Sequence, residues 1–499
     1  MRVPAIVEVG LAAAPLLLAV LLLVWRRSPG WRAGGAAWVV AAGLAALPGP
    51  FALAPDRFLA ANVRGLLLSL VVVYVLAAGL LLYNVLERAG AIRALAGAVA
   101  GTTADPARRA LLVVGALSPF FESVSGFGLA VVVVGPLLVA LGFDAKRATL
   151  LALLGQNAVP WGAMAIGTLI GAELAGVSER DMGVGSAWLH APLAFLYNGL
   201  TVAAAAGRGM VLRRLPDIVV GATALAGGVL AGSAWVSVEL AGVLGGLLAA
   251  GAQVAMAWAI EGRGRPAAGR PPGPSAARAA LPYAILVAGL LVSRLVPPVR
   301  AWLDGTLVLD AAAHGVRLPF LYSPAFFLLV ASAAAAALFR LGRRAVLVSL
   351  AATARQCWPA AAATTAFVTL STVMVAAGMT TRLAEAAAAA AGVAFALLSP
   401  LVGGLGGFMT GSNTAGNAMF GRFQVETARR AGLPPDVLAY ANNVAAANAT
   451  MASPSRVVLA VTVTGRGGEE GRAVRAILPV VAAALAIVAL HVALWSAAR

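Results

Sequence analysis

Long apolar runs follow one another along almost the whole sequence, and they constrain the fold more than any other feature. A transmembrane helix needs about 20 consecutive, mainly apolar residues. Only 11% of the chain is charged, against about 25% in a soluble domain. The sequence therefore predicts an all-α polytopic membrane protein with about twelve transmembrane helices. The predicted spans lie near residues 5–25, 35–54, 65–86, 147–171, 184–206, 215–233, 235–260, 280–297, 320–339, 358–378, 436–464 and 472–496.

Two further apolar segments, near 108–141 and 393–428, are interrupted by Gly, Pro and polar residues, and each is long enough to enter the membrane and return. Such breaks are tolerated at membrane depth only where protein or a water-filled cavity satisfies the freed backbone groups. We expect two re-entrant hairpins. At a fixed offset the segments share residues, because Leu117, Ser118, Pro119, Gly126 and Phe127 fall on Leu398, Ser399, Pro400, Gly407 and Phe408. Corresponding interrupted segments in two halves of a chain point to the binding site of a secondary transporter.

Charged residues between the spans predict the topology. Cytoplasmic loops are enriched in Arg and Lys, and the arginines alternate correctly only if the N-terminus lies outside and each hairpin returns to its own side. The first hairpin then enters from the cytoplasm and the second from outside, as in an inverted repeat. The Arg-bearing stretch 343–357 is expected to lie along the cytoplasmic face as an interfacial helix.

The same pattern divides the chain into three parts. Residues 1–261 form a first half-repeat, with its hairpin near 108–141 and a broken helix near 147–171. The Pro-rich stretch 262–278 is a predicted cytoplasmic linker. Residues 279–499 form the second half-repeat, with its hairpin near 393–428 and a broken helix near 436–464.

Each hairpin is followed by a helix with a polar break. The first break contains Asn157 and Pro160, and the second runs from Asn443 and Asn448 to Pro454. A proline removes a backbone donor and leaves carbonyls free. Free carbonyls attract cations, and half-helix N-termini attract anions. A site that contains both free carbonyls and half-helix N-termini suits an anionic substrate that moves together with a cation.

Polar residues at the tips and breaks are the candidate substrate ligands. Ser412, Asn413 and Thr414 at the second tip are natural N-cap residues beside exposed N–H donors, and we predict that they bind the substrate carboxylate; the alternative is a satisfied re-entrant turn or helix packing through small residues. The predicted substrate-binding residues are Ser123, Ser125, Gly126, Asn157, Ser412, Asn413, Thr414, Asn417, Asn443, Asn448, Ser453 and Arg456.

Two charged residues stand out within the apolar segments. Glu122 is the only acidic residue of the first hairpin, and ionisable groups at this depth are functional hypotheses by default. We predict that it carries the coupled proton; the alternative is a structural carboxylate bonded to N–H groups or to an Arg. Arg456 has three predicted roles: pairing with the substrate carboxylate, pairing with Glu122, or reaching the headgroups.

At these motifs the chain resembles the bacterial lactate permease family, over about 65–171 and 393–465. The residues that carry the resemblance are Leu82-Tyr83-Asn84, Phe121-Glu122, Gly126-Phe127-Gly128, Gly142-Phe143, Val159 to Ile166, Gly411 to Thr414, Asn417 to Phe420 and Ser453-Pro454. The resemblance implies uptake of L-lactate, D-lactate or glycolate by proton symport through the bacterial inner membrane. It also implies an elevator mechanism on a dimeric scaffold. The Ser-Asn-Thr triplet is similar to one that binds sodium and carboxylate in related dicarboxylate transporters, so sodium coupling to another carboxylate stays an alternative.

Other functional classes fit the sequence less well. The single cysteine, Cys357, and three scattered histidines form no metal or haem motif, so we expect no metal and no cofactor. The net charge is +17, and its arginines lie in short loops between apolar runs. They indicate the orientation of the spans in the membrane rather than a surface that binds nucleic acid. An intramembrane enzyme would need a nucleophile–base pair or a metal motif. A channel is the remaining rival, because hairpins that meet at mid-membrane also occur in pores.

Overall fold

The structure is a computed structural model of the full chain, and it describes residues 4–126, 128–262 and 273–498. Most of the predicted linker, 262–278, therefore lies outside the described residues. Helices dominate what is described, and the two strands form one small antiparallel hairpin in which Val308 pairs with Pro319.

The first half contains helices α1 to α13. Their bounds, with π- and 3-10 segments written η, are α1 Ala5–Val24, α2 Gly30–Ala46, α3 Pro55–Arg88, α4 Ala91–Ala100, α5 Pro106–Ala110, η1 Leu111–Leu117, α6 Ser118–Ser125, α7 Leu129–Ala140, α8 Ala145–Leu154, η2 Val159–Trp161, α9 Gly162–Ala175, α10 Glu179–Ala206, α11 Met210–Arg213, α12 Leu215–Ala231, η3 Gly232–Val236 and α13 Val238–Glu261.

The second half contains helices α14 to α23 and both strands. Their bounds are α14 Ala276–Leu295, α15 Pro297–Gly305, β1 Val308–Ala311, η4 Ala312–His314, β2 Val316–Pro319, α16 Pro324–Leu338, α17 Arg343–Ala376, α18 Met379–Ala391, η5 Gly392–Ala394, α19 Phe395–Thr410, α20 Asn413–Ala431, α21 Pro435–Ala449, η6 Thr450–Ala452, α22 Pro454–Val463 and α23 Glu470–Ala497.

Nine helical stretches of the described chain are long and apolar enough to cross a membrane, and α8 with η2 and α9 makes a tenth that is bent by 61°. Large apolar side chains on these helices face outward; Leu17 is 62% exposed, Leu66 53% and Leu490 60%. Such exposure is unfavourable in water and is expected against lipid. The predicted count of twelve is not confirmed, since α2 and α16 have only 17 and 15 residues and 436–464 is divided between α21 and α22.

The two halves have similar element orders. In each half a 34-residue helix, α3 or α17, leads through a short helix to a helix–tip–helix unit. A helix broken by a 3-10 turn and a 28-residue helix, α10 or α23, then follow. Gly90 and Gly378, which end the first turn after the long helices, both have positive φ, at 70° and 78°. The correspondence therefore extends beyond the sequence match at the tips.

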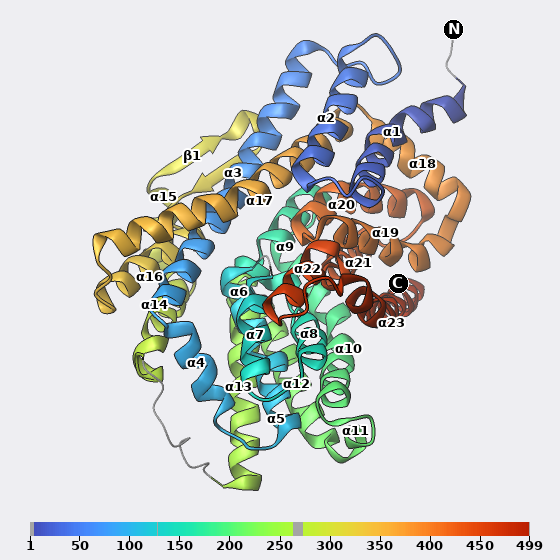
Figure 1. Ribbon diagram of the computed structural model, residues 1–499. Coiled ribbons are helices and arrows are strands. Elements are labelled where there is room, and N and C mark those ends of the chain that lie inside the picture. The colour runs from blue at the N-terminus through green and yellow to red at the C-terminus, as the bar shows by residue number, and fades with distance from the viewer. Residues whose placement is uncertain (1–3, 127, 263–272, 499) are drawn as a thin grey trace.

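The helices α3 and α17 pack side by side along one flank of the molecule (Figure 1). The Arg-bearing stretch 343–357 is the first part of α17 and continues without interruption to Ala376. It is therefore continuous with the predicted span near 358–378, and the interfacial position of its first part stays a prediction. The helix continues through Pro359, which lies inside it.

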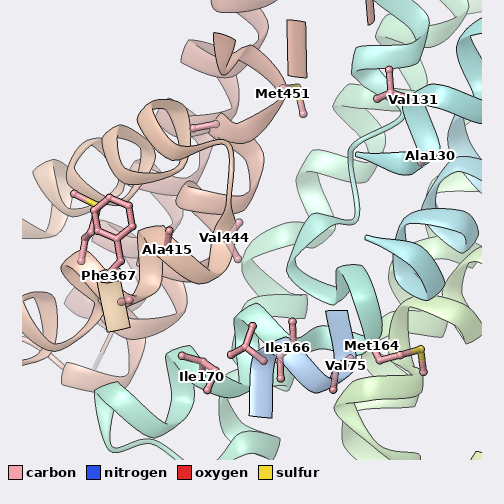
Figure 2. Packing of buried hydrophobic residues seen from close by; sticks show 14 of the residues in the cluster. Val75, Ala130, Val131, Met164, Ile166, Ile170, Phe367, Ala415, Val444 and Met451 are labelled. Carbon is pink, nitrogen blue, oxygen red and sulfur yellow. The ribbon is translucent and has the colours of Figure 1, made fainter. Parts of the chain in front are cut away.

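The tips lie inside the molecule rather than at its surface. The largest buried apolar cluster includes residues of both halves, and Figure 2 shows Ile166 and Ile170 of α9 with Ala415, Val444 and Met451 from the second half. Helix α9 contacts both α6 and α20. The core thus holds the two helix–tip–helix units and the broken helices together.

Candidate substrate site

A small cavity lies where the two tips and the first broken helix meet, and we call it the tip cavity. Its volume is about 20 Å³, and a single water needs roughly 10–15 Å³ of such volume. Its lining residues are Glu122, Val159, Gly162, Ala163, Ile166, Gly167, Ser412, Asn413, Thr414 and Arg456. Five residues predicted from the sequence therefore converge: Glu122, Ser412, Asn413, Thr414 and Arg456.

The two charged residues of the tip cavity meet at Gly128. The backbone N–H of Gly128 donates to Oε1 of Glu122 at 3.1 Å, whereas Oε2 of Glu122 has no described partner. Gly128 has a φ of 77°, and a Cβ at this position would overlap Nη1 of Arg456. Only glycine combines this left-handed conformation with such a close approach. Gly128 therefore allows both Glu122 and Arg456 to lie close to its backbone at the cavity.

Arg456 reaches the tip cavity from the first turn of α22. The side chain of Ser453 caps this helix by accepting from the Arg456 N–H at 3.4 Å. Arg456 is only 5% exposed, its Nε donates to the carbonyl of Gly411 at 3.3 Å, and its Nη1 has no described partner. Since the guanidinium is buried, the alternative in which it reaches the headgroups is wrong. Among the described residues Arg456 and Glu122 form no ion pair within 4.0 Å, and Nη1 of Arg456 keeps an unused hydrogen-bond donor.

The second tip presents the N-terminus of α20 to the cavity. Oγ of Ser412 accepts from the N–H of Ala415 at 3.3 Å, as an N-cap. No described hydrogen bond uses the backbone N–H of Asn413 or Thr414. Free N–H groups and the helix dipole make such an end a site for anions.

The first broken helix contributes an unusual backbone. Ala163, Met164 and Ala165 have φ values of 38°, 54° and 62°, in the left-handed region that costs roughly 1–2 kcal/mol for each non-glycine residue. Ala163 lines the cavity and packs against Gly126 at the first tip. Strain of this kind clusters at functional sites.

Four asparagines fasten the second tip to its surroundings, and we call Asn413, Asn417, Asn442 and Asn443 the asparagine cluster. Oδ1 of Asn443 accepts from Nδ2 of Asn413 at 2.9 Å and from Nδ2 of Asn417 at 2.8 Å. Nδ2 of Asn443 donates to the hydroxyls of two first-half residues, Thr168 and Ser186, at 2.9 Å each. Asn442 completes the cluster by donating to Oδ1 of Asn417 at 2.8 Å.

The first break, residues 155–161, contrasts with this cluster. All four side-chain polar atoms of Gln156 and Asn157 are buried and have no described hydrogen-bond partner, and neither does Nε1 of Trp161. Asn157 is 1% exposed. Its side chain is not among those that line the tip cavity, although Val159, two residues later, is.

Other predicted ligands are turned away from the tip cavity. The hydroxyls of Ser123 and Ser125 donate to carbonyls one turn back in their own helix, those of Pro119 and Phe121. Asn448 accepts from the hydroxyl of Tyr197 at 2.7 Å and donates to the carbonyl of Val444 at 2.7 Å. These side chains have partners already and do not line the cavity.

Sequence reasoning missed the apolar wall of the tip cavity. Gly162 lies against Glu122, and Gly167 lies against Asn413 and the N–H of Thr414. The only sequence signal was their small size beside a proline-containing break. Thr168, which binds Asn443, carried no signal of its own.

Comparison with known proteins identifies the family. A family model described as L-lactate permease matches residues 8–497. The chain belongs to the L-lactate permease family. It is therefore a transporter rather than an enzyme, and a multi-pass bacterial membrane protein. The match confirms the resemblance of the tips and breaks and extends it over nearly the whole chain.

The similar individual proteins include L-lactate permeases and a glycolate permease. The L-lactate permease of Salmonella typhimurium is 26% identical over 514 residues, which are 92% of this chain and 90% of that protein, and that of Escherichia coli K12 is 26% identical over 513 residues with the same coverage. The glycolate permease GlcA of Escherichia coli K12 is 39% identical over 98 residues, 20% of this chain and 17% of that protein. The solved YdaH transporter of Alcanivorax borkumensis is 17% identical, with a TM-score of 0.49 and coverage of 96% of this chain and 98% of that chain.

Proposed function

We propose that this protein takes up L-lactate, or a related small 2-hydroxy monocarboxylate such as D-lactate or glycolate, by proton symport. Membership of the family and relatives named for L-lactate and glycolate support the substrate class. The observation that carries the assignment to this site is the tip cavity, where a buried carboxyl, a buried guanidinium and a helix N-terminus meet.

The substrate carboxylate has two sets of donors in this proposal. Nη1 of Arg456 and the N–H groups of Asn413 and Thr414 face the same cavity. A guanidinium binds a carboxylate in a planar, charge-assisted manner, and the end of α20 adds its dipole. Asn157 and Asn448 are the two candidates for the 2-hydroxyl. Neither lines the tip cavity in this structure, so either would reach the substrate only after the tips move. We favour Asn157, because its amide has no described partner whereas Asn448 bonds to Tyr197 and Val444.

Glu122 carries the coupled proton in this proposal. It is 1% exposed and lines the same cavity as Arg456. Two anions in one buried site repel each other, so substrate and an ionised Glu122 compete for Arg456. Protonation of Glu122 removes the repulsion, which couples binding of the carboxylate to uptake of one proton.

Alternating access by an elevator motion completes the proposal. A cavity of about 20 Å³ is too small for lactate, so the tips have to separate before substrate enters. The similar element orders of the two halves support an inverted repeat with two re-entrant hairpins. A homodimeric scaffold in the inner membrane would hold the moving part, as the resemblance implies.

Uptake into proteoliposomes tests the proposal. Labelled L-lactate should accumulate when the inside is alkaline, without sodium, and an uncoupler should abolish accumulation. Liposomes without protein are the control. Uptake that only equilibrates would indicate a channel, and accumulation of another carboxylate instead of lactate would overturn the substrate.

Sodium coupling is the second candidate, because the first break leaves the amide oxygens of Gln156 and Asn157 buried and unpartnered. Oxygen ligands of this kind bind hard cations. A strict requirement for sodium in the same assay would replace the proton in the mechanism and keep the substrate site.

A further inference from the structure

A large basic pocket lies away from the tip cavity, between the start of α8, the end of α10 and the start of α23. Its volume is about 790 Å³. The residues of this basic pocket that carry charge are Asp144, Lys146, Arg147, Arg466, Arg472 and Arg475. In the proposed topology they lie at the cytoplasmic face.

The basic pocket has more positively charged side chains than carboxylates that pair with them. Arg147 pairs with Asp144 at 3.2 Å, and Arg472 pairs with Glu469 at 3.2 Å, where Arg466 binds as well. The hydrogen bond from Arg466, with a further one from Arg472, lowers the pKa of the Glu469 carboxyl. Two carboxylates thus serve three arginines.

The remaining two cations of the basic pocket are exposed. Lys146 and Arg475 have no ion pair or hydrogen bond among those described. They come from α8 and α23, on different sides of the pocket. An anion between them would be held by both helices.

The wall of the basic pocket is apolar. Leu150 and Leu153 of α8, with small residues of α10 and α23, line it together with the charged residues. On α23 the apolar surface continues outward to Leu478, which is 46% exposed, on a helix that is a candidate membrane span. Charged and apolar side chains in one pocket, beside a helix that is a candidate membrane span, fit an amphiphile better than a free anion.

We propose that the basic pocket binds the phosphodiester headgroup of an anionic phospholipid, with the acyl chains along α8 and α23. Basic pockets between transmembrane helices on the cytoplasmic side recognise such headgroups. Thr149 in the pocket wall hydrogen-bonds Thr464 at the end of α22 at 2.7 Å. The bound lipid therefore lies beside the contact that joins the two broken helices.

Binding to the purified full-length protein in detergent tests the proposal by native mass spectrometry and by thermal shift. The probes are phosphatidylglycerol, phosphatidylcholine and inorganic phosphate at equal concentrations. The test variant is Lys146→Gln with Arg475→Gln, and the matched control is Arg343→Gln with Arg344→Gln, a second exposed basic pair that lies outside the pocket.

We expect phosphatidylglycerol to bind the wild type and the control, and to bind the test variant about 30-fold more weakly, or about 5-fold for each cation removed. The two single variants give the smaller steps if the double variant folds poorly. Equal retention of phosphatidylcholine, or equal binding by the test variant, would overturn the proposal. Equal stabilisation by inorganic phosphate would show a free-anion site and overturn the lipid assignment.

Discussion

The two broken helices carry similar buried amide side chains, but these amides differ in whether they have hydrogen-bond partners. In the second half, the asparagine cluster is closed, because the amide of Asn443 bonds to Asn413, Asn417, Thr168 and Ser186. In the first half, the amides of Gln156 and Asn157 are equally buried and have no described partner. Buried polar groups are normally satisfied, so unsatisfied ones are candidates for binding water, ion or substrate.

This difference indicates two roles: the residues of the closed cluster hold the structure together, and the open groups are available to bind a ligand. The closed cluster joins the second tip to α9 and α10 and so fixes the geometry of the tip cavity. The open break, together with Oε2 of Glu122 and Nη1 of Arg456, supplies groups with unused bonding capacity. Changes in the closed cluster should therefore reduce stability first, and changes among the open groups should alter transport first.

The largest expected effect is at Glu122 among the open groups. Glu122→Gln should abolish accumulation of lactate driven by a pH gradient, because an amide cannot carry the proton. Exchange of lactate at equal pH should be partly retained, since the amide oxygen still accepts from the N–H of Gly128. Uptake and exchange in proteoliposomes measure both properties.

Glu173→Gln is the matched control for Glu122, since its carboxylate is 42% exposed and pairs with Arg64. Accumulation by this control should equal that of the wild type. Intact pH-driven accumulation by Glu122→Gln would remove this residue from the coupling mechanism.

The next largest effect is expected in the closed cluster. Asn443→Ala removes five described hydrogen bonds, two of which join the same pair, Asn443 and Thr168, and such bonds contribute on the order of 0.6–1.7 kcal/mol each in membrane proteins. We expect the free energy of unfolding to fall by roughly 3 kcal/mol, measured by denaturant titration in mixed micelles. A loss below about 1 kcal/mol would mean that the cluster does not fasten the tip.

A smaller effect is expected at the junction between the two charges. Gly128→Ala should raise the KM for lactate about tenfold, since its Cβ displaces Arg456 and loss of a charge-assisted bond costs roughly 1.5–3 kcal/mol. Gly142→Ala is the control, because Gly142 has a φ of 91° and no atom within 4 Å of an added Cβ. If both variants raise KM equally, backbone strain rather than Arg456 is responsible.

The sequence predicted the organisation of the site better than its details. Apolar runs and interrupted segments placed Glu122, Arg456 and the second tip together, because the repeat requires the tips to meet. The sequence could not predict side-chain direction. Ser123 and Ser125 satisfy their own helix, and no composition signal distinguishes such a serine from a ligand.

The left-handed turn at Ala163 and Met164 could not be predicted from the sequence either. Neither residue type favours positive φ, so tertiary packing imposes that turn. The predicted number of spans is not confirmed for a simpler reason, since α2 and α16 are apolar but shorter than the about 20 residues that a span typically has. Length and apolar character predict the helices, whereas packing decides their ends and their bends.

The finest test compares one asparagine from each broken helix. Asn157→Ala removes no described hydrogen bond, so the free energy of unfolding should change by less than about 0.5 kcal/mol. The KM for lactate should rise about threefold, which corresponds to the lower end of the free energy that one hydrogen bond contributes. Asn448→Ala removes bonds to Tyr197 and Val444, so stability should fall by roughly 1–2 kcal/mol with an unchanged KM. Denaturant titration and uptake kinetics on the same preparations measure both quantities. If Asn157→Ala destabilises and Asn448→Ala alters KM, the binding surface lies in the second half, and the 2-hydroxyl of the substrate has to be placed against Asn448 instead.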